Sequence, residues 1–190
     1  MTRSELEHVV RASGAIAEDA EIVVIGSQAV LGQFPNAPAV LRASMEADVY
    51  PRNHPERADL IDGAIGEGSR FHEEFGYYAQ GVGEATATLP AGWQGRLVRV
   101  RNANTGGVDG LCLEVHDLAI SKYVAGRPKD LAFTATLARH HMTRKATLLE
   151  RARRTKLTPT LRKLIEGRIG RDFPAKSPID GTSGRLVPRT

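Results

Sequence analysis

The chain has 190 residues, enough for one domain with a small helical appendage, and 41% of them are hydrophobic, which allows a conventional core and excludes wholesale disorder. Its formal net charge is +4, and its single cysteine, Cys112, excludes an internal disulfide framework. No apolar stretch approaches the roughly 20 residues that a membrane span requires, and Met1 leads into no apolar signal core. These features favour a cytoplasmic protein without a membrane partner.

Helices and short strands alternate along most of the chain. A helix over 4–13, ended by Gly14, precedes an apolar strand over 22–25. The next expected elements are a short helix from residue 28, strands over 43–50 and 77–82, helices over 57–65 and 70–75, and strands over 96–101 and 111–115. Asp117 is expected to cap a helix that runs to Ala125. Three further helices are expected over 128–139, 145–154 and 159–169.

The sequence predicts three parts: a catalytic domain over 1–138, a basic helical part over 139–173 packed on it, and an extended tail over 174–190. The basic residues of the second part are Arg139, Arg144, Lys145, Arg151, Arg153, Arg154, Lys156, Arg162, Lys163, Arg168 and Arg171. Its acidic residues before Asp172 are Glu150 and Glu166. This excess of positive charge favours contact with RNA. The alternative is a solvated helix surface without a partner.

Gly26 and Ser27 follow the apolar strand directly and open a short helical segment. Glycine lets a backbone approach a phosphate closely, and a helix start supplies free amides. The pair is not part of a P-loop or of a Rossmann fingerprint, and Gly-Ser also makes ordinary turns. Gly26 and Ser27 are therefore candidates to bind phosphate.

Glu46 and Asp48 lie one residue apart in a segment that we expect to be a strand, so their side chains share one face. Two adjacent carboxylates repel each other unless a cation neutralises them. Mg²⁺ binds carboxylate and phosphate oxygens together, and the pair therefore predicts a site for a metal-bound nucleoside triphosphate. The alternative is an exposed edge strand. Arg42 is a candidate phosphate ligand, or simply pairs with an acid.

A third group of candidates follows the last expected strand. Glu114 lies at the strand end and is a candidate metal ligand, with a surface acid as the alternative. Lys122 and Arg127 are candidates to neutralise phosphate charge. Asp130 lies in the first turn of a helix, where an acid is stabilising without any further function. The histidines show no metal-ligand spacing and are expected to be non-catalytic, with His116 as the first exception to consider.

In this order, the Gly-Ser pair, the two carboxylates and the Lys and Asp around Gly126-Arg127-Pro128-Lys129-Asp130 resemble the nucleotidyltransferase superfamily. More closely, they resemble the minimal bacterial nucleotidyltransferases related to AbiEii-type toxins of type IV toxin–antitoxin systems, including MenT toxins. The resemblance covers roughly residues 21–133 and is most distinctive over 117–131. It implies an α+β fold with a small mixed sheet flanked by helices and a helical C-terminal part.

The resemblance also implies roles for individual residues. The catalytic residues would be Glu46, Asp48, Lys122 and Asp130. The triphosphate would be held by Gly26 and Ser27, with Arg42 and Arg127 as further candidates. The metal ligands would be Glu46, Asp48 and Glu114, with Asp130 as the other candidate for the third carboxylate. The sequence departs from the family pattern in two places: Glu46 stands where aspartate is common, and the segment between Ser27 and Glu46 is longer than usual.

The leading hypothesis is a Mg²⁺-dependent transfer of a nucleotide from a nucleoside triphosphate to RNA, at the 3′ end of tRNA, by a toxin that has a cognate antitoxin. A second hypothesis keeps the enzyme class but makes a protein or a small hydroxylated molecule the acceptor. A third is a catalytically inactive module that binds nucleotide or RNA.

Overall fold

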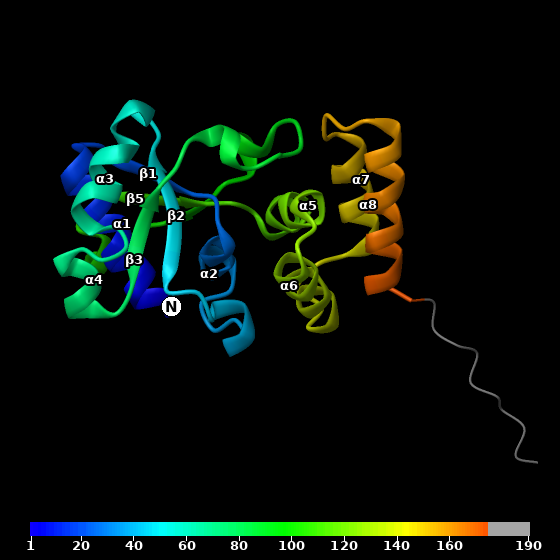
Figure 1. Cartoon of the computed structure of the whole chain (residues 1–190), viewed down its shortest axis with the longest axis horizontal. Helices are drawn as coiled ribbons and strands as arrows, with labels where there is room; N and C mark the ends of the chain where they lie inside the picture. Colours follow the sequence, from blue (N-terminus) through cyan, green and yellow to red (C-terminus); the bar gives the residue numbers. More distant parts are fainter. Residues whose placement is uncertain (175–190) are drawn as a thin grey trace, which may run out of the picture.

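A five-stranded mixed sheet organises the N-terminal part of the protein in the computed structural model, which describes residues 1–174 (Figure 1). The strand order is β3-β2-β1-β5-β4. The strands are β1 (Glu21–Val24), β2 (Glu46–Pro51), β3 (Tyr78–Gly81), β4 (Val98–Val100) and β5 (Asp109–Cys112). β1 pairs antiparallel with β2 and parallel with β5, β2 pairs parallel with β3, and β4 pairs antiparallel with β5. The expected α+β class with a small mixed sheet is confirmed.

Eight α-helices surround the sheet or follow it in the described part of the chain. They are α1 (Arg3–Ala17), α2 (Val30–Gln33), α3 (Ala58–Ile65), α4 (Arg70–Phe75), α5 (Val115–Ala125), α6 (Pro128–Arg139), α7 (Lys145–Arg153) and α8 (Pro159–Asp172). α1 and α3 pack against the sheet on one side, whereas α2 separates the sheet from α5–α8, which pack against one another (Figure 1). None of the helices described over 1–174 is long and apolar enough to cross a membrane. The tail expected over 174–190 lies outside these residues from position 175 onward.

The alternation of β2 determines what faces the helices α5–α8. Ala47 and Val49 are fully buried, and β2 packs against α1 and α3. Because successive strand residues point to opposite faces, Glu46 and Asp48 lie on the other face, where they are half-buried. Sequence alternation alone therefore places both carboxylates on the open side of the sheet.

Two helix ends differ from the sequence expectation. Gly14 does not end α1, which continues to Ala17. It is a packing position instead, because a Cβ there would lie 2.6 Å from a methyl group of Val108. Asp117 is not the cap of α5, since Glu114 occupies that position and accepts a hydrogen bond from the His116 backbone.

Asp117 instead forms a buried ion network. Its side chain is fully buried, and Arg96 binds it through two contacts, from Nε at 2.7 Å and from Nη2 at 3.1 Å. Arg151 of α7 lies 3.1 Å from the same carboxylate. Burial raises the pKa of Asp117 even though both arginines favour its charged form. One carboxylate thus joins the β3–β4 connection (residues 82–97) to α5 and α7.

Two more buried polar groups tie α5 to the C-terminal helices. The His116 ring accepts a hydrogen bond at Nε2 from the Arg144 backbone N–H, so Nδ1 carries the proton that is donated to Glu114. The Tyr123 hydroxyl donates to Asp172 at 2.6 Å, and burial together with this carboxylate raises the pKa of Tyr123. These contacts hold α7 and α8 against α5.

The ion network predicts a large difference between two arginine substitutions. We expect Arg96→Ala to lower the free energy of unfolding by about 3–5 kcal/mol, because it leaves Asp117 buried with an incomplete set of partners. Arg52→Ala removes an exposed pair with Glu21 and should cost about 1 kcal/mol or less. Urea unfolding of the two variants measures both values. Equal losses of stability would contradict the importance assigned to Asp117.

Candidate active site

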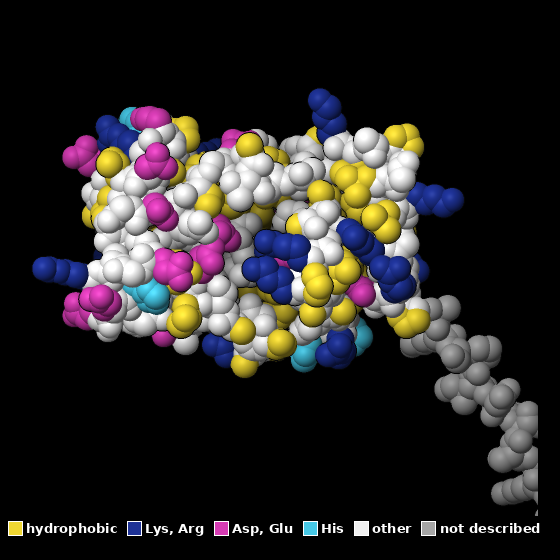
Figure 2. Space-filling model, viewed as in Figure 1, with side chains coloured by type: hydrophobic (Ala, Val, Ile, Leu, Met, Phe, Trp, Pro, Cys, Tyr) yellow, Lys and Arg dark blue, Asp and Glu magenta, His cyan; other side chains and the backbone are white. Residues whose placement is uncertain are grey.

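A cleft of about 760 Å³ separates the sheet from α5 and α6. Figure 2 shows it as a hollow with acidic side chains on the sheet side and basic side chains on the helical side. The sheet side contributes Gly26, Ser27, Glu46, Asp48 and Gln80 to its lining. The helical side contributes Ser121, Lys122, Arg127, Lys129, Asp130 and Phe133. The volume is in the range of small-molecule sites, roughly 300–1,000 Å³.

Gly26 and Asp48 lie in close contact at the base of the cleft. The Ile25 N–H donates to the Asp48 carbonyl at 3.0 Å, which extends the pairing of β1 with β2 up to the Gly-Ser pair. A Cβ at position 26 would overlap the Asp48 carboxylate. Only glycine therefore fits here without moving Asp48, and Ser27 follows at the start of a 3₁₀ turn (Ser27–Ala29).

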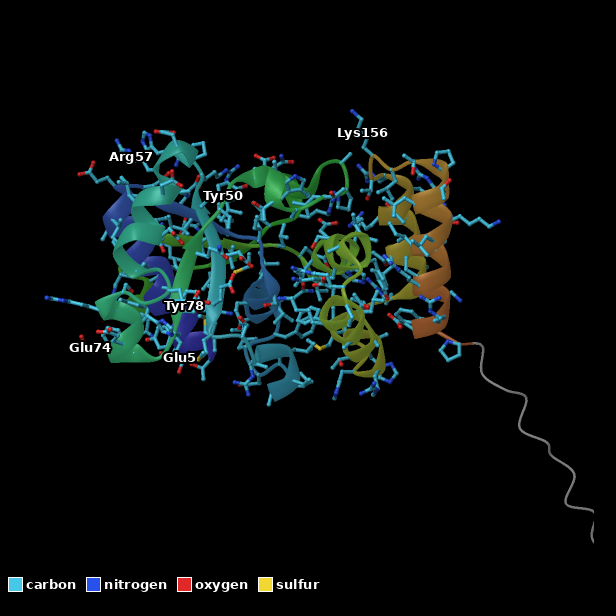
Figure 3. All side chains as sticks on the ribbon, viewed as in Figure 1. Glu5, Tyr50, Arg57, Glu74, Tyr78 and Lys156 are labelled. Atoms are coloured by element: carbon cyan, nitrogen blue, oxygen red, sulfur yellow. The ribbon has the colours of Figure 1, made fainter. Side chains whose placement is uncertain are left out.

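Glu46 and Asp48 influence each other directly. The pKa of Glu46 is raised, first by burial and then by the neighbouring Asp48 carboxylate, while Lys129 and Tyr78 act in the opposite direction. The Tyr78 hydroxyl, from β3, lies 3.5 Å from Glu46 Oε2 (Figure 3). A cation bound between the two carboxylates would relieve their repulsion.

Tyr78 and Gln80 also belong to this side of the sheet and are not among the residues predicted from sequence. The parallel pairing of β3 with β2 sets Tyr78 opposite Glu46 and Gln80 opposite Asp48. The sequence does carry a signal, because Tyr78 and Gln80 flank an alanine in the same alternation as Glu46 and Asp48. What could not be known from sequence was the register between the two strands.

Three cations face the two acids from the helical side, and Asp130 holds two of them. Asp130 is 2% exposed and contacts Arg127 Nε at 2.6 Å and Lys122 Nζ at 3.5 Å. Burial alone would raise the pKa of Asp130, but Arg127 and Lys122 lower it. The pKa of Arg127 is raised by Asp130 and further by Asp48 and Glu46 across the cleft. Lys129, the third cation, was not among the predicted site residues.

Two predicted site residues are not brought into the cleft. Glu114 is engaged by His116, with 2.7 Å between Glu114 Oε1 and Nδ1 of the ring, and it does not line the cleft. Burial alone would raise the pKa of Glu114, but its hydrogen bonds with His116 lower it. Arg42 donates from Nε to the Ala37 carbonyl at 2.6 Å and is likewise absent from the lining. Their candidate roles in binding metal and phosphate find no support in this geometry, because both side chains are committed to local structure.

A comparison with protein families identifies the class. The model described as "Nucleotidyltransferase of unknown function (DUF6036)" matches residues 4–137, which include every residue that lines the cleft. The match covers more than half of the chain, and the protein belongs to this nucleotidyltransferase family. Neither the curated proteins nor the solved structures contain a match to the chain. The narrower resemblance to AbiEii- and MenT-type toxins stays a prediction.

The close approach at Gly26 predicts a selective loss of activity. We expect Gly26→Ala to reduce nucleotide transfer by about 100-fold, because the added methyl displaces the Asp48 carboxylate. Gly63→Ala is the matched control: a Cβ there meets nothing within 4 Å, and the change should stabilise α3 by about 0.5–1 kcal/mol. Pyrophosphate release in the presence of Mg²⁺ and total cellular RNA measures the first effect, and thermal unfolding shows that both variants fold. Full activity of Gly26→Ala would show that the close contact between Gly26 and Asp48 is not needed for nucleotide transfer.

Proposed function

We propose that this protein transfers a nucleotide from a Mg²⁺-bound nucleoside triphosphate to RNA, with the 3′ end of tRNA as the acceptor. The observation that carries the proposal is the composition of the cleft. Glu46 and Asp48 stand beside Gly26 and Ser27 on one side, and basic side chains face them from α5 and α6. A triphosphate is a polyanion that needs cations around it, and the two acids need a metal ion between them and the phosphates.

The residues present fit a magnesium ion. Mg²⁺ is usually bound through one or two carboxylates together with substrate phosphates and water, and Glu46 and Asp48 provide two carboxylates in one cleft. Within residues 1–174, no group of three or more His, Cys, Asp or Glu side chains is arranged to hold a metal. The bound ion would neutralise charge that develops on the phosphates during transfer.

The side chains of the cleft would position the triphosphate for attack. The Ser27 hydroxyl would donate to a phosphate oxygen, while Lys122 and Arg127, oriented by Asp130, would bind phosphate charge from the opposite side. The acceptor hydroxyl oxygen bonds to the α-phosphorus and gives its proton to water. The bond from the α-phosphorus to the oxygen bridging to the β-phosphate breaks, and pyrophosphate leaves with the electron pair.

The basic C-terminal helices support RNA as the acceptor, but fewer of their residues are free than the sequence indicates. Arg151 binds Asp117, Arg162 donates to backbone carbonyls at the end of α7, and Arg168 donates to the Tyr123 carbonyl. The exposed basic residues are Arg139, Arg144, Lys145, Arg153, Arg154, Lys156, Lys163 and Arg171.

The β3–β4 connection runs from the end of α7 to the cleft. The Ala91 N–H donates to the Arg154 carbonyl at 2.9 Å, and the same connection lines the cleft with Thr86 and Thr88. Lys156 projects from the turn between α7 and α8 (Figure 3). An RNA bound at the end of α7 would therefore lie beside a segment that also lines the cleft.

A toxin of this kind would have an antitoxin as its protein partner, and both roles belong to the same proposal. Transfer to a protein or to a small hydroxylated molecule is the alternative that keeps the enzyme class, because the cleft chemistry does not depend on the acceptor. A module that binds nucleotide without turnover is the alternative outside that class.

The experiment that tests the proposal is a transfer assay with the purified protein, Mg²⁺, each α-³²P-labelled nucleoside triphosphate in turn and total cellular RNA, followed by a denaturing gel. We expect label at the size of tRNA, and none with Asp48→Asn, which removes one of the paired carboxylates. Asp59→Asn, an exposed change on α3 outside the cleft, is the control. Label on protein alone would show that the acceptor is a protein and not RNA. Nucleotide binding without any label would favour the catalytically inactive module.

The acceptor surface makes a separate prediction. We expect Arg153→Ala combined with Lys156→Ala to weaken RNA binding and to reduce the slope of log affinity against log salt by about one for each lost phosphate contact. Nucleotide binding should stay unchanged because neither residue lines the cleft. Arg70→Ala, at the start of α4, is the control for an exposed arginine on the far side of the sheet (Figure 1). An unchanged salt slope in the double variant would show that this surface does not hold RNA.

A further inference from the structure

Part of the cleft lining is apolar, in contrast to the acids of β2 and the charged side chains of α5 and α6. The 3₁₀ turn η2 (Ala39–Arg42) packs against α6, and the two elements contribute Val40, Leu41 and Phe133 to the lining. Val40 is 65% exposed, which makes it one of the few large apolar side chains in contact with solvent. Phe133 is half-buried. We call Val40, Leu41 and Phe133 the apolar slot.

Polar contacts hold the segment around the slot in place, and the three side chains of the slot carry no hydrogen-bonding group. Arg42 donates to the Ala37 carbonyl, and the Met1 ammonium group donates to the carbonyls of Arg42 and Ser44. The Ser44 hydroxyl, which also lines the cleft, is already engaged with the Glu46 backbone, at 3.2 Å to the carbonyl and 3.1 Å from the N–H. The long segment between Ser27 and Glu46 thus forms one wall of the slot.

The slot lies next to the cations of the cleft. Lys122 Nζ is 6.0 Å from the centroid of the Phe133 ring, so the side chain that would bind phosphate and the ring belong to adjacent parts of one cavity. A nucleoside triphosphate likewise has a polyanion at one end and a flat, largely apolar base at the other. The charged part of the cleft suits the triphosphate, and the apolar slot suits the base.

We propose that the apolar slot binds the nucleobase of the triphosphate, with Phe133 stacking on the base and Val40 covering it. The inference rests on the proposed function, since it assumes that the triphosphate lies between the acids and the cations. Side chains without donors or acceptors hold a base through its faces and do not read its edges, and every base has a face on which an aromatic ring can stack. The slot therefore binds all four nucleoside triphosphates with similar affinity.

The test compares ligands with and without a base. The full-length protein is titrated in Mg²⁺ with the α,β-methylene analogues of ATP, GTP, CTP and UTP, which block transfer, and with inorganic tripolyphosphate. We expect all four analogues to bind about 5- to 150-fold more tightly than tripolyphosphate, the value of one stacked base. We expect the affinities of the four analogues to differ from one another by a smaller factor than the factor that separates them from tripolyphosphate.

Variants of the slot should remove this advantage and leave tripolyphosphate binding unchanged. Val40→Asn is an exposed change that does not disturb the core, and Phe133→Leu keeps apolar packing while removing the ring. Leu60→Asn, at a side chain that is 54% exposed on α3, is the matched control and should bind every ligand as the unaltered protein does.

Three outcomes would contradict the proposal that the apolar slot binds the nucleobase. Tripolyphosphate binding as tightly as the analogues would show that the base makes no contact. Analogue affinities unchanged in both slot variants would place the base elsewhere in the cleft. Strong preference for one base would require a group that reads base edges. These results leave the proposed function standing, whereas binding of neither tripolyphosphate nor any analogue would overturn both proposals.

Discussion

The repulsion between Glu46 and Asp48 is the constraint on which the cleft depends. β2 can hold the two carboxylates side by side because Ala47 and Val49 anchor the other face of the strand in the core. Gly26 lets the chain pass against Asp48 without a side chain in the way. Across the cleft, Asp48 and Glu46 contribute to the raised pKa of Arg127. Lys129 in turn acts against the raised pKa of Glu46. The acids on the sheet side and the basic side chains on the helical side therefore give the cleft two walls of opposite charge.

The parts of the site that could be predicted are those that follow from local sequence patterns, and the parts that could not are those set by contacts between distant segments. The placement of Glu46 and Asp48 on one face followed from strand alternation, and Gly26 with Ser27 followed from the end of an apolar run. The sheet class, most strands and helices, and the helical C-terminal part were also predictable from local patterns. Strand register was not, and Tyr78 and Gln80 were missed for that reason.

The two predicted site residues that lie outside the cleft lining share one feature: a charged side chain near a site in sequence is engaged by local structure. Glu114 caps a helix and Arg42 braces a turn, and neither use is visible in residue type or spacing. The same holds for the basic C-terminal stretch, where three arginines make contacts within the protein: Arg151, Arg162 and Arg168. Charge counted along a sequence therefore overstates the charge that is available to a partner.

The contacts of α5 set a limit on how far this protein can be shortened. The family match ends at residue 137, yet His116 and Tyr123 each have a hydrogen-bond partner beyond it, at Arg144 and Asp172. Asp117 likewise shares its charge with a residue of α7. A truncation after α6 would keep every cleft-lining residue but would remove one partner from each of three buried polar groups of α5, the helix that carries Lys122. The segment matched by the family model thus depends on the C-terminal helices for contacts that hold α5, one wall of the cleft, in place.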